Sequence, residues 1–169
     1  LFSTNRKDLR MTSQVRCIDE LPTHLAERCR IAHDAPVAGS NGYVLYWMCS
    51  AVRTEENPAL DTAILLARHL DVPLLVYHGL SQSYPWASDR HHTFILQGAR
   101  DVQRQFAERG IRYIFHLEQH GQESGALSLL VEQAGVVVTE EMPTGPHALF
   151  LRGLLSRTQR PIVAVDTSC

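Results

Sequence analysis

The chain has 169 residues, of which 44% are hydrophobic and 20% are charged, a length and composition typical of one globular domain with its own core. A formal charge of −2 and a pI near 6.5 argue against a strongly basic surface, and therefore against tight nucleic-acid binding by this chain alone. No apolar run reaches the roughly 20 residues that a membrane span needs, so we expect no membrane partner.

The cysteines are scattered and include no C-x-x-C pair: they are Cys17, Cys29, Cys49 and Cys169. This usage fits a reducing cytosol better than a disulfide framework, so we expect a cytoplasmic protein. Cys17, His24, Cys29 and His33 superficially resemble a zinc-ligand set. The gap from Cys17 to His24 fits no common zinc finger, and we therefore predict no metal site.

Residues 1–42 show no clean hydrophobic period, and the stretch HDAPVAGSNG at 33–42 is rich in residues that break regular structure. We expect residues 1–42 to form an arm or linker that leads into an α/β domain at 43–169.

Strand-like and helix-like segments alternate from residue 43 onward. YVLYWM at 43–48 predicts a strand buried on both faces. Asn57 then predicts a helix cap with Pro58 at the first helical position, and apolar residues follow at helical spacing up to Leu70. PLLVYH at 73–78 predicts a second strand.

The alternation continues to the end of the chain. After a loop at 81–89, Ser88 or Asp89 caps a helix that Gly110 ends. Further strands are predicted at 111–117, 136–140 and 161–166, with helices at 126–134 and 147–155 between them.

Such alternation with short connections requires right-handed crossovers and a parallel sheet covered on both faces. The predicted fold class is therefore α/β: a three-layer, Rossmann-like domain with a five-stranded parallel sheet. For its strands, numbered along the chain, we expect the common order 3-2-1-4-5.

In such a sheet, ligands bind outside the carboxyl ends of the strands, where the strand order reverses. Here that crevice lies between the strands at 43–48 and 136–140, and His78 and Asp166 end the neighbouring strands. The predicted cofactor-binding residues are Met48, Cys49 and Arg53 on one side and Glu140, Glu141 and Met142 on the other. No glycine-rich phosphate loop and no nucleophile motif is present, so we predict no catalytic residue.

Each charged candidate has a simpler interpretation. Arg53 could bind an anionic ligand, but pairing with Glu55, Glu56 or Asp61 on the surface is favoured. Glu140 and Glu141 could form a carboxylate pair for acid–base chemistry, but a solvated loop is favoured. For Tyr46 and Trp47, core packing is favoured over a shelf for an aromatic ligand.

Four segments, in the same order along the chain, resemble class II DNA photolyases and related bacterial proteins. YWMCSAVRTEENPAL at 46–60 is similar to the family's Y-W-M-x-R-D-Q-R-x-x-D-N-W-A-L, although Ser50 to Val52 replace Arg-Asp-Gln and Pro58 replaces tryptophan. The segment at 84–102 resembles R-H-x-x-F-x-L-x-G through Arg90, His91, Phe94, Leu96 and Gly98. VVVTEE at 136–141 resembles V-V-T-D, and VAVD at 163–166 resembles V-x-V-D.

The resemblance implies the N-terminal, antenna-type domain of a deoxyribodipyrimidine photo-lyase, which repairs pyrimidine dimers in DNA with light. In that family an N-terminal α/β domain can hold a folate or deazaflavin chromophore. A C-terminal helical domain binds FAD and the damaged DNA, from which the lesion is flipped. We expect that domain to be absent from this chain, and the chain alone to be non-catalytic. Two alternatives remain: a stand-alone nucleotide-binding module of universal-stress-protein type and a cryptochrome-like light sensor without repair activity.

Overall fold

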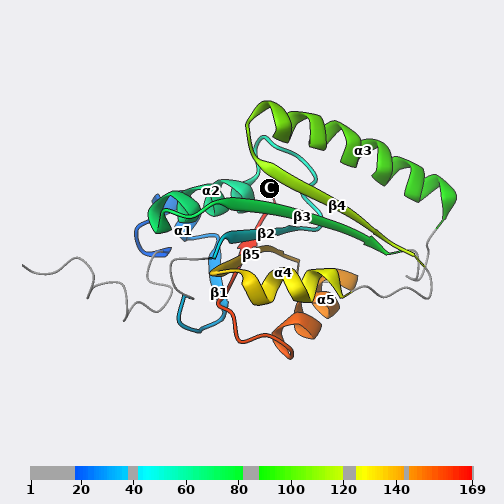
Figure 1. The fold of residues 1–169 in the computed structure, drawn as a ribbon. Coiled ribbons are helices and arrows are strands. Elements are labelled where there is room, and N and C mark those ends of the chain that lie inside the picture. The colour runs from blue at the N-terminus through cyan, green and yellow to red at the C-terminus, as the bar shows by residue number, and fades with distance from the viewer. Residues whose placement is uncertain (1–17, 38–41, 82–87, 120–124, 143–144, 169) are drawn as a thin grey trace, which may run out of the picture.

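The computed structural model describes residues 18–37, 42–81, 88–119, 125–142 and 145–168 and contains one sheet with helices on both faces (Figure 1). The helices are α1 (Thr23–Ala26), α2 (Pro58–Leu70), α3 (Asp89–Glu108), α4 (Ala126–Gln133) and α5 (Pro146–Leu155). The strands are β1 (Cys29–His33), β2 (Val44–Met48), β3 (Leu74–Ser81), β4 (Arg112–Glu118), β5 (Val136–Glu141) and β6 (Ile162–Asp166).

The strand order is β1-β6-β5-β2-β3-β4. The five predicted strands lie in the predicted order, and all pairs among them are parallel. The predicted number of strands is wrong, because β1 adds a sixth strand, antiparallel to β6. Its sequence, CRIAH, lacks the apolar run of a central strand, and its residues are at least partly exposed. An edge strand pairs on one side only and is partly open to solvent, so it does not need the apolar run of a strand that is buried on both faces.

Helix boundaries follow the predicted caps. The Asn57 side chain accepts a hydrogen bond from the backbone N–H of Leu60 (3.1 Å), which starts α2. Ser88, one of the two proposed caps of α3, accepts from the N–H of His91 at 3.3 Å. Gly110 follows α3 with φ of 67°, a conformation that glycine adopts without strain.

The sheet has a separate apolar layer on each face because successive strand residues point to opposite sides. On β2, Val44, Tyr46 and Met48 pack toward α1, α2 and α3. Leu45 and Trp47 pack on the other face, toward α4 and α5 (Figure 1). Tyr46 and Trp47 are both buried, which confirms the core-packing interpretation.

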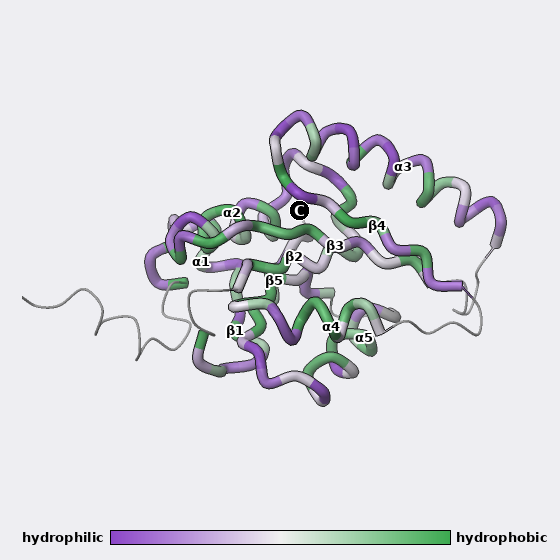
Figure 2. Tube along the Cα trace, in the orientation of Figure 1, coloured by the Kyte–Doolittle hydropathy of each residue, from purple (hydrophilic) through white to green (hydrophobic). Residues whose placement is uncertain are grey.

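Helix α3 is only partly packed against the sheet. Its buried residues, Ala99, Val102 and Phe106, all lie in its C-terminal half. Figure 2 shows the helix as mostly hydrophilic, in contrast to the apolar central strands. Within the described ranges, no helix combines the length and the apolar character that crossing a membrane requires.

Of the four residues that superficially resemble a zinc-ligand set, Cys29 and His33 lie at the two ends of β1 and His24 lies in α1. Cys29 is a free thiol whose sulfur lies 3.7 Å from Oγ1 of Thr62. In the part of the chain that the structure describes, no three metal-ligating side chains are grouped to hold an ion. Cys17 lies outside the described residues.

Candidate functional site

The carboxylate of Glu140 is the centre of the polar contacts at the carboxyl edge of the sheet. The residue is only 4% exposed. Its Oε1 accepts hydrogen bonds from the hydroxyl of Tyr46 (2.8 Å) and the backbone N–H of Cys49 (3.1 Å). Its Oε2 accepts from the backbone N–H groups of Ser50 (2.5 Å) and Ala51 (2.8 Å). Four donors from one segment of chain therefore surround this carboxylate.

Strand pairing explains why the carboxylate meets this loop. β2 and β5 are parallel neighbours, and their register places Trp47 opposite Thr139. Glu140 is thus next to the point where β2 ends and the chain turns away. A buried carboxylate is costly unless it accepts hydrogen bonds, and backbone N–H groups make strong bonds to it. The loop N–H groups stabilise Glu140, and Glu140 in turn fixes the loop.

Asn57 holds the same loop from its other side. Its Nδ2 donates to the carbonyl oxygens of Ala51 and Arg53, both at 3.0 Å, and to the hydroxyl oxygen of Tyr46 at 3.1 Å. Burial raises the pKa of Tyr46 well above its usual value, and the neighbouring Glu140 carboxylate adds to the shift. Asn57 is therefore both a helix cap and the link between the strand, the loop and the helix.

The predicted residues on the β2 side differ in accessibility. Met48 is fully buried in the core. Cys49 is half-buried, and burial raises the pKa of its thiol well above the usual value. Arg53 is exposed, and its Nε donates to the carbonyl oxygen of Glu56 (3.0 Å). Among the described residues, no ion pair joins Arg53 to Glu55, Glu56 or Asp61, so the favoured interpretation of a surface ion pair is wrong.

On the β5 side, neighbouring residues have different partners. The favoured interpretation of a solvated loop is wrong for Glu140, because the β2 loop buries it. Glu141 accepts from Nε of Arg30 on β1 (2.8 Å). The structure therefore does not bring Glu140 and Glu141 together as a carboxylate pair. Met142 follows β5 and is half-buried.

His78 and Tyr113 form a second buried polar contact near this edge. Nδ1 of His78 lies 2.9 Å from the hydroxyl oxygen of Tyr113, and the imidazole packs edge-on against Phe115. Burial lowers the pKa of His78 to about 4, although the Glu140 carboxylate opposes the shift. The sequence indicated His78 only as a strand end. It gave no signal for Tyr113, because their contact depends on the register of β3 and β4.

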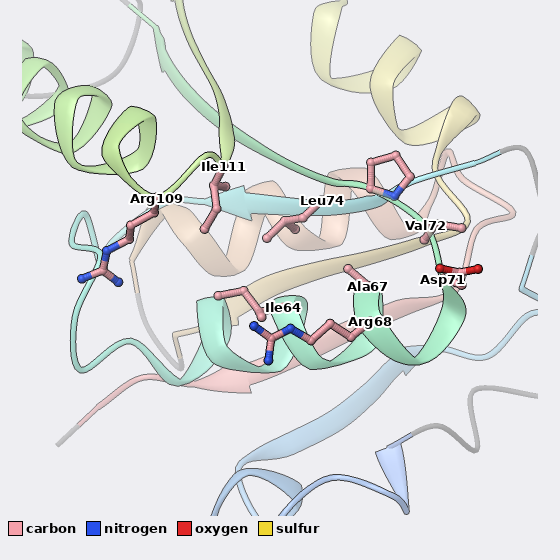
Figure 3. A pocket seen from close by; sticks show the side chains of 9 residues that line it. Ile64, Ala67, Arg68, Asp71, Val72, Leu74, Arg109 and Ile111 are labelled. Carbon is pink, nitrogen blue, oxygen red and sulfur yellow. The ribbon is translucent and has the colours of Figure 1, made fainter.

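A hollow of about 680 Å³ lies away from the predicted crevice, at the amino ends of β3 and β4 (Figure 3). The apolar residues that line it include Ile64, Ala67, Leu74 and Ile111. Arg68 and Arg109 also line it, but Arg109 donates to the carbonyl oxygen of Thr54 and to the carboxylate of Glu55. None of the predicted cofactor-binding residues lines this hollow.

The polar network joins two segments that are far apart in the sequence and that both carry the family resemblance. Tyr46 and Asn57 belong to the stretch at 46–60, and Glu140 belongs to the stretch at 136–141. Their side chains meet at the end of β2. The family resemblance at Tyr46, Asn57 and Glu140 therefore has a structural explanation, because these side chains hold the loop that follows β2.

Comparisons with known proteins agree with this resemblance. The DNA photolyase family model matches residues 44–145. The deoxyribodipyrimidine photo-lyase of Methanothermobacter thermautotrophicus is 40% identical over 89 residues, which are 53% of this chain and 20% of that protein. The match therefore spans about a fifth of that relative's length.

Two solved structures have the same fold. A class III photolyase from Agrobacterium tumefaciens is similar with a TM-score of 0.57 and 16% identity, over 76% of this chain and 26% of that one. A universal stress protein from Archaeoglobus fulgidus is similar with a TM-score of 0.50 and 16% identity, over 73% of this chain and 98% of that one. At this identity both show the fold alone.

Proposed function

The chain belongs to the DNA photolyase family, and from this we propose that it is the N-terminal α/β domain of a deoxyribodipyrimidine photo-lyase that repairs pyrimidine dimers in DNA with light. The observation that carries the proposal is the 40% identity to a photo-lyase over 89 residues. In the longer protein, a helical domain binds FAD and the damaged DNA. The role of this chain is to support that domain and not to catalyse the reaction itself.

The residues at the carboxyl edge fit an antenna chromophore only on the outer surface of the loop. Glu140 and Glu141 are engaged with the loop and with Arg30. Arg53 is exposed and has terminal nitrogens without a charged partner among the described residues, so it can bind an anionic group such as a folate carboxylate. A bound folate or deazaflavin absorbs light and passes the energy to the flavin. We assign Arg53 to that contact, and we propose that Cys49 and Met142, which follow β2 and β5 at the same edge and are half-buried, complete the site.

The exposed half of α3 suits a contact with the flavin domain. Phe94 is 74% exposed and Leu96 is 42% exposed, although both are apolar residues of a matched motif. The two residues are two positions apart on a helix and therefore face different sides, so a partner that covers both has to pack around this end of α3. We propose that the helical flavin domain covers this segment, and that damaged DNA reaches the protein through that domain.

The nucleotide-binding alternative is not favoured by the site. Phosphate-binding loops use free backbone N–H groups, and in the loop after β2 those of Cys49, Ser50 and Ala51 already donate to Glu140. A light sensor of this family would have the same fold but would not split pyrimidine dimers. An assay of dimer splitting therefore separates the light-sensor alternative from repair.

The test uses the purified full-length protein. We expect flavin and antenna absorbance, and light-dependent splitting of pyrimidine dimers in DNA. Arg53→Ala should lower the antenna absorbance without lowering the flavin absorbance, whereas Arg68→Ala, at the other end of the sheet, should lower neither. Flavin absorbance without dimer splitting would favour the light sensor. A protein with neither flavin nor splitting would overturn the proposal.

A further inference from the structure

The backbone N–H groups of Cys49, Ser50 and Ala51, which we call the amide loop, converge on one carboxylate. Successive N–H groups that point to one side form a concave site for an anion, as in phosphate-binding loops. The donor distances of 3.1, 2.5 and 2.8 Å show that the site is filled. The anion that fills it is the side chain of Glu140 from the neighbouring strand, and it is buried.

An anion supplied by the chain itself has a strong advantage over one from solution. Its backbone is fixed in β5, so it loses little freedom when it binds, and its effective concentration at the amide loop is high. An external phosphate would have to displace it and leave a carboxylate buried without donors, which is unfavourable. The hydroxyl of Tyr46 adds a fourth donor to the internal anion.

We propose that Glu140 is an internal ligand of the amide loop and a specificity-determining residue at the carboxyl edge. It closes the switch point of this Rossmann-like sheet to phosphate groups, such as those of nucleotides. Ligands of this edge must therefore bind outside the amide loop, through other groups.

Substitution of Glu140 by alanine offers a direct chemical test. The change removes one methylene and the carboxylate, which together correspond to acetate. Glu140→Ala should therefore leave an amide loop with free donors and a space that acetate fits. Glu141→Ala is the matched control, because it removes the adjacent carboxylate, whose partner is Arg30 and not the amide loop.

The measurements are thermal unfolding and two-dimensional ¹H–¹⁵N NMR of the 169-residue chain, in chloride, acetate and inorganic phosphate at equal ionic strength. We expect Glu140→Ala to unfold roughly 10 °C below the wild type in chloride. Acetate should raise the unfolding temperature of Glu140→Ala by several degrees and shift the amide signals of its residues 49–51. In the wild type and in Glu141→Ala, neither acetate nor phosphate should move these signals.

Two results would overturn the inference. One is a phosphate-dependent shift of these amide signals in the wild type, because it would show that the loop accepts an external anion. The other is a Glu140→Ala protein that unfolds at the same temperature in acetate as in chloride, because it would show that the emptied amide loop does not bind a carboxylate. If Glu140→Ala does not fold, Glu140→Gln supplies the test. Glutamine keeps the shape of the side chain and one acceptor oxygen, but it replaces the other oxygen by an NH₂ group that cannot accept. The amide signals of Ser50 and Ala51 should therefore shift, whereas the amide signals of residues near Arg30 should not.

The amide loop and Glu140 bind each other whether or not the full-length protein repairs DNA with light. A full-length protein that fails to split dimers would leave these results unchanged. Conversely, an open amide loop would not affect the family relationship on which the proposed function rests.

Discussion

The hydroxyl oxygen of Tyr113 on edge strand β4 lies 2.9 Å from Nδ1 of His78 on β3. The imidazole is buried on the face that packs against α2 and α3, and its ring also contacts Phe115. Because the interior disfavours the charged form, His78 is neutral in the folded protein at physiological pH. This contact links stability to pH.

The free energy of unfolding should fall as the pH falls from about 6.5 to about 4. Burial lowers the pKa of His78 from 6.5 to about 4, so the unfolded chain binds a proton over this range before the folded protein does. The stabilisation is complete above pH 6.5 and is lost as the pH falls toward 4, with a total of about 3 kcal/mol. Urea unfolding at a series of pH values measures it.

Other carboxylates also titrate near pH 4, so the contribution of His78 is the difference between two proteins. His78→Gln keeps a polar group for Tyr113 but cannot titrate. Its stability should depend less on pH between 6.5 and 4 than that of the wild type. Equal slopes for the two proteins would contradict a buried neutral imidazole at this position.

Two helix caps should differ in their contribution to stability. Asn57→Ala removes the cap of α2 and the bonds that its side-chain amide donates to Tyr46, Ala51 and Arg53, which tie the strand and the loop to the helix. We expect a loss of about 3 kcal/mol in the free energy of unfolding. Ser88→Ala removes an exposed cap with one bond to the N–H of His91 and should cost about 1 kcal/mol or less. Chemical denaturation of both variants decides the comparison, and similar losses would show that Asn57 acts as a cap alone.

The ion pair between Arg30 and Glu141 should contribute little. It joins β1 to β5 across β6, but the two side chains are 52% and 33% exposed. Water and salt screen such pairs, so a double-mutant cycle with alanine should give a coupling free energy below about 1 kcal/mol, smaller at high salt. A larger, salt-independent coupling would mean that this contact holds the edge strand in place.

Phe94→Ser should affect the full-length protein and not the isolated chain. In the isolated chain Phe94 is 74% exposed, so its loss should change thermal stability by less than about 0.5 kcal/mol. In the full-length protein we expect faster proteolysis between the two domains, since an apolar contact is lost. Leu129→Ser, on α4 outside the matched motifs and also exposed, is the control and should leave proteolysis unchanged. Equal proteolysis of both variants would exclude α3 from the domain contact.

The succession of central strands and helices was predictable because local signals act at every boundary, whereas the spatial order 3-2-1-4-5 was expected only as the common one and is confirmed by the structure. Asn57 and Gly110 mark helix ends through their own side chain or backbone conformation. The apolar runs are long enough to define buried strands. Because these strands alternate with helices along the chain, a parallel sheet with right-handed crossovers is expected. β1 was not predictable in this way, because an edge strand with an arginine and a histidine has no distinctive local pattern.

The sequence alone thus determined the fold class, the succession of strands and helices from residue 43 onward, the edge of the sheet where polar residues gather and the family resemblance. Only the tertiary structure decided what those residues do. The separate partners of Glu140 and Glu141, the last two residues of β5, could not be read from the sequence. Their roles diverge because successive strand residues point to opposite faces. That alternation sends Glu140 to the amide loop and Glu141 to Arg30.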